Sequence, residues 1–375
     1  TLFEEMDYYK NLGLDIIMQP ASPGLYNDMD SIFKTLEDEL HITLDLIDDN
    51  FSLQLILPGI IEYSNADSLA GDTLFWLFHL EEYINDDYIT INQAVDNINK
   101  DKAVIFNKFK IKKVDDKVRI LEPNGTVHEI VYTNKKKNEI PWVGKPDILF
   151  ECSGKNTVRK DCLDFLTGET KLVIISATSW DADKTLVYGF NHDSFDSKYK
   201  VISYGSCTVN AFTPLAAFID KKYGLENADV NVIHNIQKYR VDENYTLNRK
   251  FCTLEKSAVQ LMECINENNF MVNYTVIPYT GVSTIDYRFK LNNCPSIDQF
   301  LFDIEASIKD GDLHGLYDIH EVDIGPEVHN CSTFSSVFIK EGIKVIDDQV
   351  YIFSYFDNEN SVNRFYDLAN FICGK

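Results

Sequence analysis

The sequence predicts an α/β protein with two main domains, a parallel sheet in the first and an α+β arrangement in the second. At 375 residues the chain is long enough for two domains, each with its own core. Short apolar segments such as Asp147–Glu151 and Lys171–Ser176 indicate buried parallel strands. After Cys207, strands alternate with amphipathic helices, which is typical of the second kind of domain.

The composition is that of a globular, acidic protein. Hydrophobic residues make up 45% of the chain and charged residues 25%, and 59 acidic against 35 basic residues give a net charge of −24. Such a surface repels the phosphates of nucleic acids and anionic lipids, so we expect neither nucleic acid nor membrane as a partner. The eight cysteines form no CxxC pair and no metal-ligand spacing. This pattern predicts reduced thiols in a cytoplasmic protein without a structural metal.

Residues 1–50 are expected to form an N-terminal extension. Asp28–Leu40 places apolar side chains at helical spacing, and Thr43–Ile47 suits a strand. One interpretation is an extra layer on the core or an oligomer contact. The alternative is a binding module, or a plug over a vacated pocket.

The next segment has the pattern of a βαβ unit. Phe51–Leu57 predicts a strand, a helix is expected from about Asp72 to Tyr83, and Tyr88–Ile91 predicts a second strand. In a dinucleotide-binding unit, glycine N–H groups at the helix start hold the pyrophosphate. The intervening segment, Gly59–Asp72, contains no G-x-G-x-x-G and carries carboxylates in or beside the loop. A nucleotide site built there would therefore be degenerate.

The remaining elements follow from alternation and turn signals. Ala103–Tyr132 reads as β-strands with a hairpin turn at Pro123–Gly125. Thr253–Asn268 is an amphipathic helix, and Asn358 opens a final helix over Val362–Ile372. Further strands are predicted at Phe270–Ile277, Val282–Leu291, Thr333–Ile339 and Gln349–Phe356.

Cys207 is the strongest chemical candidate. It follows the apolar run Tyr199–Ile202 and stands at the start of a helix predicted from about Thr208. A helix N-terminus favours a thiolate and aims free N–H groups at an oxyanion beside the sulfur. Twenty-seven residues later, His234 ends another apolar run and offers a base. The alternatives are a buried structural cysteine and a core histidine.

The segment Ser206-Cys207-Thr208-x-Asn210, with His234 at this separation, resembles the glyceraldehyde-3-phosphate dehydrogenase family. Four further segments resemble the family in matching order: Asp147–Gly154, Leu172–Ser179, Val187–His192 and Tyr355–Arg364. The likeness runs from about Asn92 to the end of the chain. It implies a Rossmann-like domain over residues 51–206 and 358–375, with an α+β catalytic-type domain over residues 207–357.

The resemblance also implies a nicotinamide cofactor, NAD or NADP. Gln93 stands where the family has an acidic residue that holds the adenosine ribose, so this contact would be weaker. Ser153 and Gly154 resemble a cofactor-facing loop, although serine and glycine are also ordinary loop residues. Asn358 resembles the residue that holds the nicotinamide amide, with an N-cap as the alternative.

The family's phosphate contacts are largely replaced. Ser206 and Thr208 match the motif, but the Thr-Gly pair maps to about Lys256-Ser257, and the arginine of the following strand maps to Val276. Arginine is a bidentate phosphate ligand that lysine reproduces poorly. Lys256 and Arg240, together with Lys238, could rebuild an anion site or simply form charged surface.

The loop between His234 and Arg249 is shorter than the family's S-shaped loop, which completes a neighbour's cofactor site in the tetramer. This argues against a family-type tetramer. A homodimer through the sheet of the second domain, or a protein partner, is expected instead.

Two classes of function remain open at this point. In the first, Cys207 and His234 perform covalent thiol chemistry on a small-molecule or carrier-bound aldehyde or acyl (thioester) substrate other than glyceraldehyde 3-phosphate. Such an enzyme would be a divergent aldehyde dehydrogenase or a cofactor-free acyl-transfer or hydrolytic enzyme. In the second, the chain is a pseudoenzyme that serves as a binding or structural subunit.

Overall fold

A computed structural model describes residues 50–56, 68–70, 73–79, 89–135, 139–236 and 247–374. The chain divides into two compact units, Thr1–Ala94 and Val95–Lys375. The predictions for residues 1–49 and the Gly59 to Asp67 part of the degenerate loop lie outside the described residues, as does Arg240. The predicted domain boundaries near residues 50 and 206 stay predictions.

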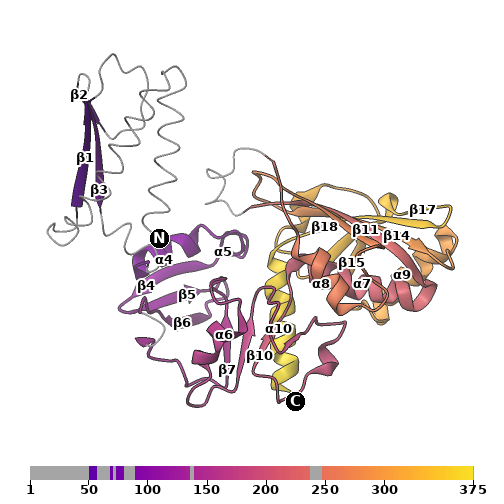
Figure 1. The fold of residues 1–375 in the computed structure, drawn as a ribbon, viewed down its shortest axis with the longest axis horizontal. Coiled ribbons are helices and arrows are strands. Elements are labelled where there is room, and N and C mark those ends of the chain that lie inside the picture. Colours follow the sequence, from indigo (N-terminus) through magenta and orange to yellow (C-terminus); the bar gives the residue numbers. More distant parts are fainter. Residues whose placement is uncertain are drawn as a thin grey trace. The chain divides into compact units, whose positions relative to one another are not determined.

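The first unit contains an antiparallel sheet in the order β1-β3-β2 (Figure 1). Its strands are β1 (Asn50–Ile56), β2 (Ser68–Ala70) and β3 (Thr73–His79). The predicted strand over Phe51–Leu57 is confirmed. The helix predicted from Asp72 is wrong, because Thr73–His79 pairs along its whole length with β1. Its unbroken apolar and aromatic run is compatible with a helix or a strand, and pairing with β1 decides between them.

The predicted strand Tyr88–Ile91 is also wrong, since α4 (Ile91–Asn99) begins at its last residue. Thr90 N and Thr90 Oγ1 each donate to Gln93 Oε1 at 2.8 Å, and Gln93 N donates to Thr90 Oγ1 at 3.3 Å. These reciprocal bonds form a capping box, which starts a helix at this point. Gln93 therefore lies at a helix start and not at the end of a strand.

A helix and an antiparallel sheet open the second unit. The short helix α5 (Lys102–Phe106) takes the first residues of the segment predicted to be β-strands. Asp101 caps it by accepting from the N–H groups of Ala103 and Val104. The sheet β4-β5-β6 follows, with strands Lys110–Val114, Lys117–Leu121 and Val127–Val131.

The predicted hairpin turn lies between β5 and β6. Glu122 N donates to Thr126 O at 2.9 Å, and Gly125 adopts a φ of +90°, which favours glycine. The turn prediction is confirmed.

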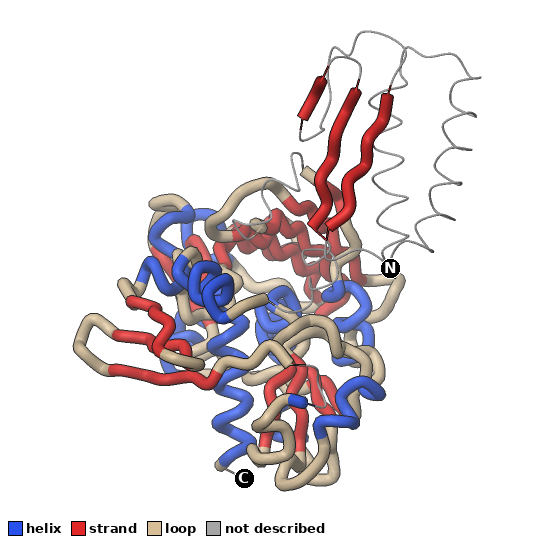
Figure 2. Tube along the Cα trace, turned by 90° about the vertical axis from the view of Figure 1, so that its left-hand side faces the viewer, coloured by secondary structure: helices blue, strands red, loops and turns tan. Residues whose placement is uncertain are grey.

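The parallel sheet has the order β7-β8-β10-β9. Its strands are β7 (Ile148–Glu151), β8 (Leu172–Ile175), β9 (Lys184–Thr185) and β10 (Val201–Ser203). One face packs on the C-terminal helix α10 (Glu359–Cys373), the blue helix that ends beside the C label in Figure 2. Ile174, Ile202 and Leu368 belong to one buried cluster there. The other face packs on residues around Cys162 and Phe165. Burial on both faces explains the mainly apolar composition of the two central strands, β8 and β10.

The largest sheet has eight strands, in the order β12-β13-β11-β14-β18-β16-β15, with β17 beside β18. The bounds are β11 Leu225–His234, β12 Asn248–Arg249, β13 Phe270–Val276, β14 Ser283–Leu291, β15 Tyr317–His320, β16 Ser336–Ile339, β17 Lys344–Ile346 and β18 Gln349–Phe356. The four predicted strands of this region are confirmed, so the α/β class with a parallel sheet followed by an α+β part is correct.

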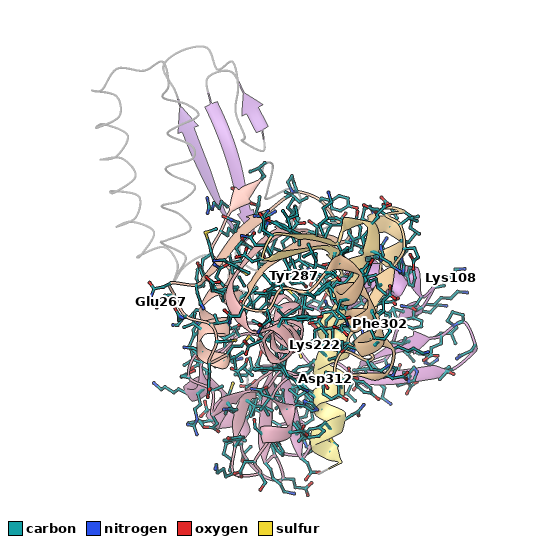
Figure 3. All side chains as sticks on the ribbon, turned by 90° about the vertical axis from the view of Figure 1, so that its right-hand side faces the viewer. Lys108, Lys222, Glu267, Tyr287, Phe302 and Asp312 are labelled. Atoms are coloured by element: carbon teal, nitrogen blue, oxygen red, sulfur yellow. The ribbon has the colours of Figure 1, made fainter. Side chains whose placement is uncertain are left out.

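Three helices pack against this eight-stranded sheet: α7 (Cys207–Tyr223), α8 (Thr253–Leu261) and α9 (Ile297–Asp310). Phe212 of α7 packs within one core cluster against Tyr287 and Phe289 of β14. Tyr287, labelled in Figure 3, also donates its hydroxyl to Ala211 O at 2.9 Å. The core therefore fixes α7, and with it Cys207, on β14.

Helix α8 is shorter than predicted. It ends at Leu261, where Met262 takes an extended conformation. Asparagine side chains then bind the backbone locally: Asn269 Oδ1 accepts from Asn266 N at 2.7 Å, and Asn269 Nδ2 donates to Cys264 O at 2.9 Å. Such side-chain bonds compete with helical ones, so the turn replaces the last part of the predicted helix.

Within the described ranges, no helix combines the length and the apolar character that crossing a bilayer requires. In the same ranges, no three His, Cys, Asp or Glu side chains are grouped in a way that could hold a metal ion.

Candidate active site

Cys207 is the first residue of α7, four residues after Ser203, the last residue of β10. Ser206 is the N-cap, and its Oγ accepts from Val209 N at 3.3 Å. The side chain of Cys207 is half-buried, and the helix begins at the cysteine itself, one residue earlier than predicted. The helix start thus places the sulfur beside free backbone N–H groups.

His234 ends β11 and brings its ring to this helix start. Its Nε2 lies 3.5 Å from Cys207 Sγ. Its Nδ1 lies 2.6 Å from the backbone carbonyl oxygen of Asn235. A carbonyl oxygen only accepts, so Nδ1 carries the proton in the neutral ring and Nε2 faces the thiol with its lone pair. The two residues that the sequence singled out are therefore in contact, in the orientation that a base requires.

Burial dominates the electrostatics of this pair. It raises the pKa of the Cys207 thiol to about 12, with a smaller contribution from the neighbouring Cys252. The N–H groups of Thr208 and Cys207 oppose this increase. Burial, by Tyr274 and Phe356 among others, also lowers the pKa of His234. The expected effect of the helix start on the thiol is outweighed, and the pair rests as a neutral thiol beside a neutral imidazole.

Hydroxyl groups line the site next to the sulfur. Ser206 Oγ lies 3.2 Å from Thr208 Oγ1 and accepts from Thr253 Oγ1 at 3.2 Å. Thr208 Oγ1 also lies 3.6 Å from Cys252 Sγ. The predicted residues Ser206 and Thr208 are thus joined to the start of α8, and Thr253 was not identified from the sequence.

Lys256 lies at the same end of α8 but is exposed. Its Nζ stands 4.4 Å from the ring centroid of Trp180, a cation–π contact that the sequence does not indicate. On the other side, Val276 is buried and pairs in register with His234. The strand position that the resemblance assigned to an arginine therefore presents an apolar side chain next to the histidine.

Asn358 stands at the N-cap position of α10 without a side-chain capping bond. Its Nδ2 donates to Asn235 Oδ1 at 3.0 Å instead. Its Oδ1 is buried and forms no hydrogen bond of ordinary geometry with the part of the chain that the structure describes, although the Asn358 side chain is close enough to the His234 ring to oppose the lowering of its pKa. A buried acceptor of this kind fits an N–H donor of a ligand, such as a primary carboxamide. Asn235, which no sequence signal had marked, is the residue that orients this amide.

The other residues predicted to bind the cofactor are Ser153, Gly154 and Gln93, and they differ in whether their groups are already hydrogen-bonded within the protein. Ser153 follows β7, and its N–H and hydroxyl both donate to the buried Glu151 carboxylate, the N–H at 2.8 Å. Gly154 has a φ of +73° and open space where a Cβ would point, which permits close approach of a ligand. Gln93 is engaged in the cap of α4. Contact of these residues with a cofactor stays a prediction.

The described residues fit the nicotinamide end of such a cofactor better than its pyrophosphate. The orphan oxygen of Asn358 and the open position at Gly154 fit the cofactor. The described residues β1, β2 and β3 form an antiparallel sheet, so they supply no βαβ unit for a pyrophosphate.

No family model matches the chain. It is similar to several curated proteins named as dehydrogenases. It is 28% identical over 264 residues to glyceraldehyde-3-phosphate dehydrogenase 1 of Giardia intestinalis, covering 65% of this chain and 77% of the relative. It is 28% identical over 248 residues to the cytosolic glyceraldehyde-3-phosphate dehydrogenase of Pisum sativum, covering 61% and 72%. The enzyme of Geobacillus stearothermophilus matches at 29% over 265 residues, covering 66% and 78%.

These matches agree with the resemblance found around Cys207 and His234. They also agree with the parallel sheet that precedes Cys207 and the eight-stranded sheet that carries His234. The chain is a divergent member of the glyceraldehyde-3-phosphate dehydrogenase family.

Proposed function

We propose that this chain is a thiol enzyme in which Cys207 attacks the carbonyl carbon of an aldehyde or thioester and His234 is the general base. The observation that carries the proposal is the 3.5 Å contact between Cys207 Sγ and His234 Nε2, with Nδ1 held by Asn235 O. A neutral pair suits this role, because the proton moves from sulfur to nitrogen only as the sulfur attacks.

The chemical step balances within these groups. The S–H proton moves to Nε2, the S–C bond forms, and the carbonyl π electrons move onto oxygen. The N–H of Cys207 at the helix start and the new imidazolium stabilise this oxyanion. With a thioester substrate, the oxyanion collapses, the C–S bond to the leaving thiolate breaks, and that thiolate takes the proton from Nε2. The acyl group is then held on Cys207 for transfer or hydrolysis.

With an aldehyde substrate, the same attack gives a hemithioacetal, whose oxidation to a thioester requires a hydride acceptor. NAD or NADP would supply that acceptor when bound. Asn358 Oδ1 would then accept from the carboxamide N–H, and the Gly154 backbone would allow close approach. The antiparallel arrangement of β1 to β3 supports weakened cofactor binding.

The substrate differs from glyceraldehyde 3-phosphate in this proposal. Val276 lies beside His234 where a phosphate-binding arginine is expected by resemblance, and Lys256 is held over Trp180. The net charge of −24 disfavours phosphorylated ligands in general. A small-molecule or carrier-bound aldehyde or acyl group without a phosphate is therefore the proposed substrate class. A cytoplasmic location and a homodimer or a protein partner complete the proposal.

A second candidate function is that of a pseudoenzyme acting as a binding or structural subunit. One observation favours it: burial raises the pKa of Cys207 to about 12, which leaves little thiolate at neutral pH. At pH 7 a pKa near 12 gives a thiolate fraction of about 10⁻⁵, whereas an ordinary thiol has a few per cent.

Alkylation of Cys207 by iodoacetamide at pH 6–7 separates the two functions. Peptide mapping by mass spectrometry would follow Cys207, with the exposed Cys373 as an internal reference. The enzyme proposal expects Cys207 to react faster than Cys373, and His234→Asn to slow Cys207 by about a hundredfold. His314→Asn, at an exposed histidine outside the site, is the matched control. Slow alkylation that is insensitive to His234→Asn supports the pseudoenzyme.

Thermal shift with NAD and NADP tests the cofactor. A ligand at a hundred times its Kd stabilises the folded state by about 2.7 kcal/mol. No shift at millimolar concentrations of either cofactor would remove the dehydrogenase and leave acyl transfer or hydrolysis.

A further inference from the structure

Asn235 is a buried polar residue behind the candidate active site that forms several hydrogen bonds to the described residues. It directly follows His234 and is 6% exposed. Its Nδ2 donates to Gly281 O, and its Oδ1 accepts from Asn358 Nδ2 at 3.0 Å and from Ser283 Oγ at 3.0 Å. Its backbone N–H donates to Ser283 Oγ at 3.0 Å. The side chain of Asn235 is therefore held by hydrogen bonds to three residues, Gly281, Ser283 and Asn358.

The contacts of Asn235 determine what His234 offers to the thiol. Its carbonyl oxygen, 2.6 Å from Nδ1, selects the tautomer with a free Nε2. The bonds to Ser283 and Gly281 hold that carbonyl in place, because they fix both the backbone and the side chain of the same residue. A shift of the carbonyl would release Nδ1 and turn the ring away from the sulfur.

The same residue determines what Asn358 offers to a ligand. An amide can present its NH₂ or its oxygen, and the oxygen of Asn235 can only accept. Asn358 Nδ2 is therefore turned toward Asn235, and its Oδ1 is left as the buried atom without a partner among the described residues. A donor on the ligand is thereby selected over an acceptor.

We propose that Asn235 is a positioning residue, which fixes the tautomer and direction of the His234 ring through its carbonyl and the orientation of the Asn358 amide through its side chain. The inference rests on the proposed function, since it assigns Asn235 to the Cys207–His234 pair. It acts through these two residues and touches neither the sulfur nor the reacting carbon.

The test is the pH dependence of Cys207 alkylation in Asn235→Ala, measured with iodoacetamide from pH 6 to 9 beside the wild type and His234→Asn. We expect the rate at pH 7 to fall about tenfold, part of the loss that removing the base itself causes, and the pH profile to move toward that of His234→Asn. Asn360→Ala is the matched control, because Asn360 is a buried amide that binds Ser335 O at 2.7 Å and does not contact His234. It should lose stability without moving the profile.

The outcomes distinguish the two proposals. A wild-type profile in Asn235→Ala, with His234→Asn slowed as expected, overturns the positioning role and leaves the proposed function standing. If His234→Asn itself reacts like the wild type, both are overturned. Should Asn235→Ala fail to fold, Asn358→Ala removes one anchor from the other side. It should slow alkylation about threefold in the same direction, and an unchanged profile would again overturn the role.

Discussion

The ion pair between Lys102 and Asp357 gives the sharpest prediction for stability. Lys102 Nζ lies 2.6 Å from Asp357 Oδ1 and donates to Gly281 O at 3.2 Å. The Asp357 side chain is fully buried, while that of Lys102 is 31% exposed. The change Lys102→Met keeps the aliphatic stem and removes the charge, so it leaves a carboxylate buried without its cation.

Breaking a fully buried pair from one side costs about 3–5 kcal/mol. Asp357 keeps the N–H of Cys331 at 2.7 Å, and water reaches the lysine, so both features reduce the penalty. We therefore expect Lys102→Met to lower the free energy of unfolding by about 2–3 kcal/mol. Urea unfolding at pH 7, followed by far-UV circular dichroism, measures it.

The chain supplies a matched control for this measurement. Lys221 and Asp312 form a pair of nearly equal length, 2.7 Å, but their side chains are 74% and 60% exposed. Figure 3 labels Asp312. Lys221→Met should cost about 0–1 kcal/mol, because exposed pairs are screened by solvent. The double variant Lys102→Met/Asp357→Asn should recover most of the loss. Equal losses in the two single lysine variants would refute the argument that burial sets the magnitude.

Three further predictions concern the second unit. Burial lowers the pKa of His329, so on acidification the unfolded chain takes up a proton on this ring at a higher pH than the folded chain does. The folded state therefore keeps its full stability above about pH 6.5 and loses part of it below that pH. His329→Gln should make the free energy of unfolding, measured in urea, fall less steeply with decreasing pH. Phe212→Ala should lower the free energy of unfolding by about 3–5 kcal/mol, since its ring is fully buried against three others, and an exposed control, Phe302→Ala, should not. Gly189→Ala should cost about 1–3 kcal/mol by thermal melting, because φ is +82° and a Cβ would collide with Leu316; an unchanged melting temperature would contradict it.

Local patterns were sufficient where the signal lies within a few residues. The apolar run Tyr199–Ile202 followed by Cys207-Thr208 predicts a strand and then a helix start, and Pro123–Gly125 predicts a hairpin. All of these predictions are confirmed by the structure. Each depends on caps, turns or periodicity, which act between neighbours in the chain. The same reasoning failed at Thr73–His79, because an apolar run of that length suits a helix or a strand until its pairing partner is known.

Local patterns were enough to predict that a helix begins beside Cys207 and that His234 ends an apolar run. The 3.5 Å separation of their side chains, and the burial that keeps the thiol neutral, follow only from how distant elements pack. The tertiary structure also decided that Asn235 orients Asn358, 123 residues away, and that Lys102 neutralises Asp357, 255 residues away. Desolvation and hydrogen bonding depend on which distant groups exclude water together, and no local pattern carries that information.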